Sequence, residues 1–108
     1  MTIDYIWLDP VYLVEGASRA LSVEFEGAST ITSPGAEVYD AIDGSDLAST
    51  YMPAGSHSVN GNLVTLKPFV TTAAQGGKEL VLVIYATVDG NVDYRKCMVY
   101  ILDKTVPY

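Results

Sequence analysis

The chain has very few of the side chains on which most enzyme and metal sites depend. Its 108 residues include one cysteine, Cys97, and one histidine, His57. A single cysteine excludes a disulfide within the chain, and a single histidine excludes a metal site built from several imidazoles. A Ser-His-Asp or Cys-His arrangement would have to use His57. Because so few groups could transfer protons, we predict that the chain is not an enzyme and needs no cofactor.

Basic residues are also scarce. Six Lys and Arg stand against 13 Asp and Glu, which gives a formal net charge of −7 and a pI of about 4.3. Proteins that bind nucleic acid cluster Lys and Arg against the phosphates, but here only Arg95 and Lys96 are adjacent. We therefore expect neither nucleic acid nor an anionic membrane surface as a partner. The negative charge is expected to keep the protein soluble.

No hydrophobic run is long enough to cross a membrane as a helix. The longest, Leu80–Val88, has nine residues, whereas a spanning helix needs about 20. Near the start of the chain, Asp4 and Asp9 interrupt the apolar residues, and no basic segment precedes them. We therefore expect no signal peptide, and synthesis in a cytoplasm.

Short runs of β-branched and tyrosine residues, bounded by Gly, Pro, Asn, Asp and Ser, predict an all-β fold. Leu21, Val23 and Phe25 alternate with polar residues, which indicates a strand with one buried face. Further strands are expected at residues 3–8, 11–14, 36–42, 47–52, 63–69, 79–88 and 92–103. These seven or eight short strands favour an antiparallel two-sheet β-sandwich of immunoglobulin-like type over a closed barrel. At this length we expect one domain, residues 1–108.

Two dipeptides predict tight hairpin turns. Asn60-Gly61 has the residue types that tolerate the two positive φ angles of a type I′ turn, and Asp89-Gly90 is a second turn of this kind. Pro68 cannot donate a hydrogen bond within a sheet, so it marks an edge or a strand end. Residues 33–35 are expected to form a loop that leads into the strand at 36–42. The loop at 71–78 has room for a single helical turn.

The histidine and the cysteine both have ordinary structural explanations. His57 lies just before the predicted turn at 60–61, where a solvent-accessible side chain is expected. The side chain of Cys97 is expected on the same, core-facing side of its strand as Val99 and Ile101. A buried thiol of this kind behaves as a small hydrophobe. A Cys97-His57 pair stays open, because residues far apart in sequence can be neighbours in space.

Three aspartates around Gly44 could supply oxygen ligands to calcium. Asp40, Asp43 and Asp46 flank that glycine, and clustered loop carboxylates are calcium ligands in other proteins. Their spacing does not match an EF-hand, and Asp and Gly are also ordinary turn residues. We therefore predict no metal site, and the question whether these aspartates bind calcium stays open at this point.

Eight tyrosines are the most informative surplus in the composition. Tyrosine offers a large contact area at low entropic cost and is enriched at interfaces. If the last predicted hairpin forms, Tyr85, Tyr94, Met98 and Tyr100 lie on the sheet face away from the core. We predict that these four residues bind a partner, because exposed apolar patches often mark interaction surfaces. The alternative is that loops or the segment around Trp7 cover them.

Three segments in the later part of the chain carry a resemblance to a known family. They are Ala36-Glu37-Val38-Tyr39-Asp40, Asn62-Leu63-Val64-Thr65-Leu66, and Glu79–Val92 with the hydrophobic strand that follows. Their order resembles that of small immunoglobulin-like modules in the virion proteins of tailed bacteriophages. The N-terminal third does not match this pattern, and no site residue is carried over.

The resemblance implies a non-enzymatic subunit of a phage tail, baseplate or head. Such a subunit docks onto itself or onto other virion proteins, so we expect a homo-oligomer or a part of a larger assembly. Its place is the virion, after synthesis in the host cytoplasm. The alternative from another class is a carbohydrate-binding module, in which Trp7 and surface tyrosines stack on sugar rings. The residues do not decide whether Thr105–Tyr108 is a frayed tail or an arm that reaches a neighbouring subunit.

Overall fold

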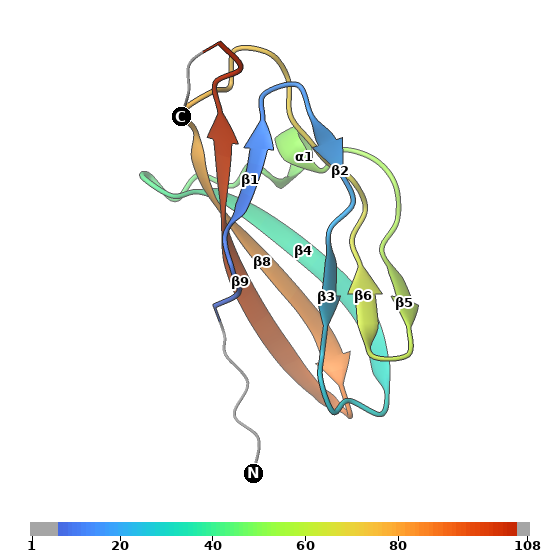
Figure 1. The fold of residues 1–108 in the computed structure, drawn as a ribbon. Coiled ribbons are helices and arrows are strands. Elements are labelled where there is room, and N and C mark those ends of the chain that lie inside the picture. Colours follow the sequence, from blue (N-terminus) through green and yellow to red (C-terminus); the bar gives the residue numbers. More distant parts are fainter. Residues whose placement is uncertain (1–6, 106–108) are drawn as a thin grey trace.

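The computed structural model describes residues 7–105 and forms an all-β domain over that range (Figure 1). The expected strand at 3–8 and the tail 105–108 lie largely outside the described residues. The elements, in chain order, are β1 Val11–Val14, β2 Ser18–Arg19, β3 Ser22–Glu24, β4 Ile31–Asp40, α1 Ala48–Tyr51, β5 Ser58–Asn60, β6 Leu63–Thr65, β7 Phe69–Val70, β8 Glu79–Val88 and β9 Asn91–Leu102.

The strands form two layers that face each other (Figure 1). One sheet has the order β1-β9-β8-β4, in which β1 runs parallel to β9 and the other pairs are antiparallel. The second layer is the antiparallel sheet β3-β6-β5. Beside it lies the short antiparallel pair β2-β7, in which β2 precedes β3 in the chain and β7 follows β6.

The strand order identifies the sandwich as immunoglobulin-like, as predicted. In that fold, strands C, F and G form one sheet, and strands B, E and D belong to the other. Assigning the letters B to G, in chain order, to β3, β4, β5, β6, β8 and β9 reproduces both sets of neighbours.

Apolar side chains from both layers form the core. The side chains that alternate along β8 and β9 face inward, as the sequence pattern predicts, and the second layer contributes residues such as Val23, Phe25 and Val64. Tyr51 of α1 stacks on Phe69 with ring centroids 5.3 Å apart. The inward side chains of β8 and β9 in this core are Leu80, Leu82, Ile84, Ala86, Cys97, Val99 and Ile101.

The two predicted hairpins form, but only one has the expected turn. Asp89 and Gly90 are the central residues between β8 and β9, with φ of 49° and 88°, which is the type I′ pattern. In the β5-β6 hairpin, Asn60 pairs with Leu63, so the central residues are Gly61 and Asn62. Positive φ occurs only at Gly61, at 64°, which is the type II′ pattern. The expected type I′ turn centred on Asn60-Gly61 is therefore wrong.

β4 begins earlier than predicted, because residues 33–35 belong to the strand instead of forming a loop. β4 is an edge strand, where a proline is tolerated. Its register shifts between Thr32 and Gly35, and Ser33 has a φ of 52°. This bulge absorbs the residues that look like a loop in the sequence.

Residues 47–52 were expected to form a strand and instead include the helix α1. The Asp46 carboxylate accepts a hydrogen bond from the Ala48 amide at 3.0 Å, at the start of this turn of helix. Tyr51 and Met52 then point into the core. The pattern of short apolar runs does not distinguish a strand from a buried turn of helix, and here the helix forms.

The remaining connections differ little from expectation. The predicted strand at 63–69 is divided into β6 and β7 on either side of Lys67-Pro68, so Pro68 does mark a strand end. The loop 71–78 contains turns but no helix. No helix in residues 7–105 is long and apolar enough to cross a membrane.

Candidate docking site on the outer face of the four-stranded sheet

The side chains of the four-stranded sheet that point away from the core form a largely aromatic surface. The register places Tyr85 beside Tyr94, Val81 beside Met98, and Tyr12 beside Tyr100. We call this surface the tyrosine face, and its members are Tyr12, Tyr39, Val81, Val83, Tyr85, Tyr94, Met98 and Tyr100.

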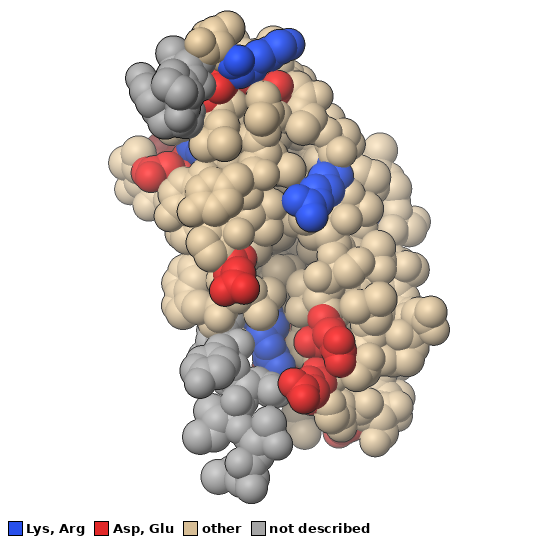
Figure 2. Space-filling view, viewed as in Figure 1, with Lys and Arg blue, Asp and Glu red and all other residues tan. Residues whose placement is uncertain are grey.

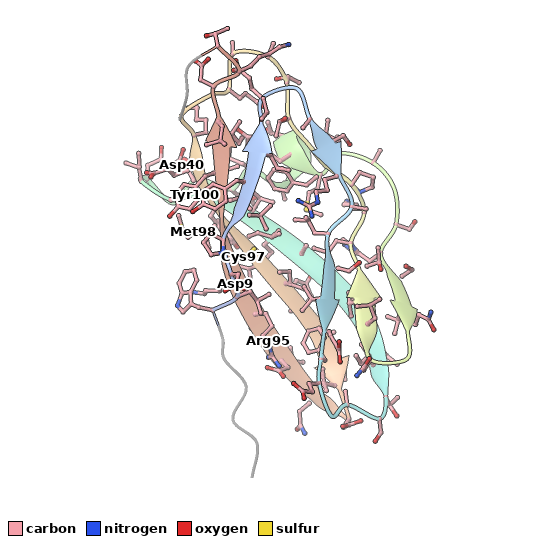
Figure 3. The ribbon with its side chains drawn as sticks, viewed as in Figure 1. Asp9, Asp40, Arg95, Cys97, Met98 and Tyr100 are labelled. Carbon is pink, nitrogen blue, oxygen red and sulfur yellow. The ribbon has the colours of Figure 1, made fainter. Side chains whose placement is uncertain are left out.

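The four residues predicted to bind a partner all lie on the tyrosine face. Tyr85 comes from β8, whereas Tyr94, Met98 and Tyr100 come from β9. Figure 3 shows Met98 and Tyr100 on the side of β9 that is turned away from the second layer. Their role as partner-binding residues stays a prediction.

Tyr85 and Tyr94 form one aromatic pair at the end of the sheet near the 89–90 turn. Their ring centroids are 5.6 Å apart, and Tyr94 is 50% exposed. Tyr85 lies over Gly35 of the edge strand, so closely that a Cβ atom at Gly35 would clash with the tyrosine ring. The glycine thus lets Tyr85 lie flat against the sheet and fixes the base on which Tyr94 packs.

Tyr12 and Tyr100 form a second pair across the parallel β1-β9 contact. Their rings are stacked, with centroids 5.3 Å apart and an interplanar angle of 18°. Tyr12 is 58% exposed. Val81, Val83 and Met98 lie between the two pairs on β8 and β9. Val83 is only 8% exposed, and exposed Lys96 stands opposite it in the register, so a cation lies between the two aromatic pairs.

The segment around Trp7 lies at the side of this surface. Trp7 forms a bridge with Lys96 in β9, whose Nζ lies 5.5 Å from the centre of the indole ring. Trp7 itself is 53% exposed. Of the four predicted residues, Tyr94 is exposed, whereas Tyr85, Met98 and Tyr100 are half-buried. The alternative in which loops or the Trp7 segment cover the tyrosines therefore does not hold for Tyr94 within the described residues and stays open for the other three.

Acidic side chains lie among the tyrosines. Tyr39 donates hydrogen bonds to the two carboxylate oxygens of Glu37, at 3.0 and 3.2 Å. This hydrogen bond to Glu37 raises the pKa of Tyr39, with a further increase from partial burial. The Glu79 side chain shares the outer face, opposite Tyr100 in the register. The face therefore combines apolar contact area with the carboxylates of Glu37 and Glu79 and the ammonium group of Lys96.

Asp40, Asp43 and Asp46 act as hydrogen-bond acceptors for the turn that follows β4. Asp40 accepts from the amides of Ile42 and Asp43, at 2.8 and 3.2 Å. Asp43 accepts from the Ser45 amide at 2.8 Å, and hydrogen bonding to Ser45 lowers the pKa of Asp43. Within residues 7–105, no group of three or more His, Cys, Asp or Glu side chains is placed to hold a metal ion.

Cys97 and His57 lie in different layers and have separate structural roles. The Cys97 thiol is buried in the core, and burial raises its pKa to about 11, so it is a protonated thiol at neutral pH. His57 precedes β5, and its Nδ1 accepts a hydrogen bond from the Lys67 amide at 3.1 Å. The structure does not bring the two residues together as a nucleophile and base.

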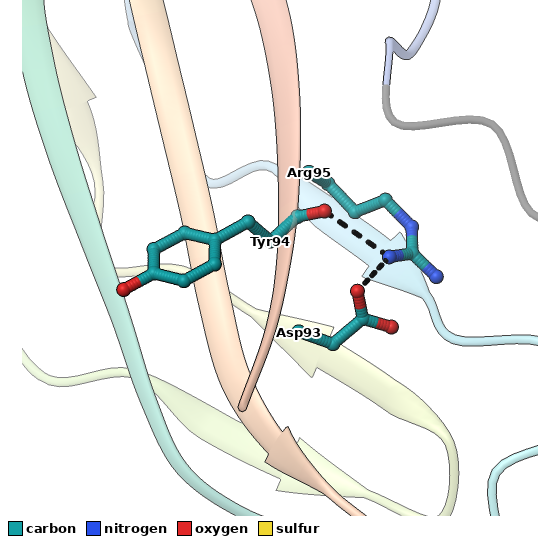
Figure 4. Close-up of polar contacts among 3 residues, drawn as sticks. All are labelled: Asp93, Tyr94 and Arg95. Carbon is teal, nitrogen blue, oxygen red and sulfur yellow. Dashed lines mark hydrogen bonds and ion pairs between the residues drawn. The ribbon is translucent and has the colours of Figure 1, made fainter. Parts of the chain in front are cut away.

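Arg95 is a charged residue whose burial the sequence pattern was not used to predict. It is 4% exposed, and its Nη1 lies 2.7 Å from a carboxylate oxygen of Asp93 and donates to the Tyr94 carbonyl at 3.2 Å (Figure 4). Its guanidinium carbon lies 4.8 Å from the centre of the Phe25 ring. The alternation of β9 could have found it, because residue 95 has the inward phase of Cys97.

Comparisons with known proteins assign neither a family nor an activity to the chain. No protein-family model matches the chain, and no curated protein matches it in sequence. Two solved chains are similar in structure, both at 21% identity and a TM-score of 0.49. One comes from a crystal structure of a mutant Titin M10-Obscurin like 1 Ig complex and covers 91% of this chain and 89% of its own. The other comes from a second crystal structure of the Titin M10-Obscurin like 1 Ig complex, with 91% and 90% coverage. The fold assignment above rests on the strand order.

Proposed function

We propose that the chain is a non-enzymatic interaction module that docks through the tyrosine face. The observation that supports this proposal is the pair of aromatic contacts, Tyr12 with Tyr100 and Tyr85 with Tyr94, on one outer sheet face. Tyrosine rings lose little rotamer entropy on binding, and rings already held by neighbours lose less.

The occupant that we propose for this face is another copy of the chain, within a phage particle. The resemblance of residues 36–102 to virion modules supports this part of the proposal, and other virion subunits are the alternative partners. Mass spectrometry of purified particles from a producing host tests the location. Finding the protein in the cell lysate but not in the particle would contradict a virion role.

Self-association through this face has a specific dependence on salt. Each copy carries a net charge of −7, and the tyrosine face itself carries two carboxylates, Glu37 and Glu79, and one cation, Lys96. Docking two such faces brings like charges together, and salt screens this repulsion. Association between copies should therefore strengthen with salt, whereas docking onto a basic partner should weaken.

The first test compares Tyr94→Ala with a matched surface variant. Tyr94 is half exposed at the centre of an aromatic contact, so its truncation is expected to weaken self-association by about tenfold or more. Val59→Ala, at a 37% exposed site on β5 of the other sheet, is the control and should leave the affinity unchanged. Sedimentation velocity over a range of concentrations and salt measures both. Equal association of the two variants would contradict docking through this face.

Exposed Trp7 supports carbohydrate binding as a second candidate function. Its ring is already engaged by Lys96 on one side, but an open aromatic surface can stack on a sugar. Glycan binding that is lost in Trp7→Ala and kept in Tyr94→Ala would favour this function over protein docking.

A further inference from the structure

The sandwich is open along one side of β3. β3 pairs with β6 through one edge, and no strand within residues 7–105 pairs with its other edge. Residues 7–14 could close this edge but follow β9 instead. Trp7 forms a bridge with Lys96, the Leu8 amide donates to the Lys96 carbonyl at 2.7 Å, and β1 pairs in parallel with β9.

A groove of about 550 Å³ lies along this open edge. Apolar side chains from both layers line it, including Leu8, Val11, Leu21, Val23, Leu82 and Cys97. Asp9 and Glu24 lie in its walls, together with Arg19. Figure 2 shows a hollow in this part of the surface with acidic side chains on both sides and a basic side chain between them. The groove thus has an apolar base and walls that carry two carboxylates and one guanidinium group.

The free edge of β3 carries unused backbone hydrogen-bonding groups. The Phe25 amide donates to the Asn62 carbonyl, and the Leu21 carbonyl accepts from the Leu66 amide, both at 2.8 Å. Backbone groups of successive strand residues point to opposite sides. Residues 21, 23 and 25 therefore bond toward β6, whereas Ser22 and Glu24 direct their N–H and C=O groups into the groove.

We propose that this edge binds an extended, basic segment of a partner protein as an added strand. Main-chain bonds to Ser22 and Glu24 would supply affinity, and alternate apolar side chains would enter the groove beside Leu21 and Val23. The intervening side chains would lie beside Glu24 and across from Asp9, where Lys or Arg is favoured by charge. This site is separate from the tyrosine face and does not depend on it.

The experiment uses the full chain and synthetic peptides of about nine residues, enough to span an ordinary strand. The peptides have Val at alternate positions and Lys, Ser or Glu between them. Fluorescence anisotropy is expected to show the Lys peptide binding about tenfold or more tighter than the Glu peptide. Amide hydrogen exchange, followed by NMR, should slow at Ser22 and Glu24 when the Lys peptide binds.

Four variants locate the binding site. Ser22→Pro removes an N–H that points into the groove and leaves the bonds to β6 intact, so it should abolish peptide binding. Val59→Pro removes the equivalent outward N–H at the opposite edge of the same sheet, on β5, and should leave binding unchanged. Glu24→Lys keeps the backbone and should reverse the preference between the Lys and Glu peptides. Tyr94→Ala should bind peptide like the parent, which separates this proposal from docking through the tyrosine face.

Several results would overturn the proposal. Failure of all three peptides to bind would do so, as would equal binding by Ser22→Pro and Val59→Pro. Slow exchange of the Ser22 and Glu24 amides in the peptide-free monomer would mean that the chain itself fills the edge. Protection that appears only as the chain self-associates would assign the edge to a second copy instead of a basic segment.

Discussion

At the scale of single residues, the chain places its few reactive groups where they stabilise structure. Arg95 shows this most clearly. Its side chain points inward from β9, where the guanidinium group forms an ion pair with Asp93 and lies over the ring of Phe25. A buried charge is tolerated when it is paired and hydrogen-bonded. The sequence indicates which way the residue points, but its partners depend on how the two sheets pack.

His57 leads to a prediction on the pH dependence of stability. Partial burial, and to a lesser extent the charge of Lys67, lower the pKa of His57 in the folded protein. The unfolded chain, with a histidine pKa of about 6.5, therefore binds a proton more readily than the folded chain. The stabilisation that neutral His57 contributes is fully present above about pH 6.5. It is lost as the pH falls through the lower pKa of His57 in the folded protein. Protonation of Nδ1 also removes the acceptor used by the Lys67 amide.

The matched variant is His57→Asn, whose amide oxygen can accept the same hydrogen bond but does not titrate. We expect the melting temperature of the parent to fall more between pH 7 and pH 5 than that of His57→Asn. Differential scanning calorimetry at the two pH values measures this difference. A fall of the same size in both proteins would show that His57 is not the group responsible.

At the scale of elements, the sequence predicts a strand well when a turn or loop flanks it on each side. β8 has the bounds predicted for it, 79–88, and β1 has the predicted bounds 11–14. Prediction fails where tertiary contacts decide. β4 extends through Ser33-Pro34-Gly35 because an edge strand tolerates proline and a bulge, and Tyr85 from the neighbouring strand covers the glycine.

The β5-β6 turn leads to a prediction on stability. Gly61 has a φ of 64°, whereas Asn60 lies at the end of β5 without positive φ. Gly61→Val should lower the free energy of unfolding by about 1–2 kcal/mol, because an L-residue with a branched side chain resists this conformation. Asn60→Val, at an exposed strand position, should change it by less than about 0.5 kcal/mol. Urea unfolding of both variants measures the two values. Equal destabilisation would mean that the turn is centred on Asn60-Gly61.

At the scale of the whole molecule, the fold presents two different surfaces from one sandwich. The tyrosine face is the outer side of the sheet β1-β9-β8-β4, and the groove lies at the free edge of β3 in the other layer. Alternation along β8 and β9 was enough to predict that Tyr85, Tyr94, Met98 and Tyr100 share a face. The contributions of Tyr12 and Gly35 could not be predicted, since they depend on β1 pairing in parallel with β9 and on the bulge in β4.

The central claim is that the chain docks through the tyrosine face, and side-chain footprinting with hydroxyl radicals tests it most directly. The rate of modification is compared between dilute protein and concentrated protein in high salt. We predict that Tyr12, Tyr94, Met98 and Tyr100 become protected as the protein associates, while exposed Val59 on the other sheet reacts at an unchanged rate. Association that protects the β5 side and leaves these four residues equally reactive would contradict the claim.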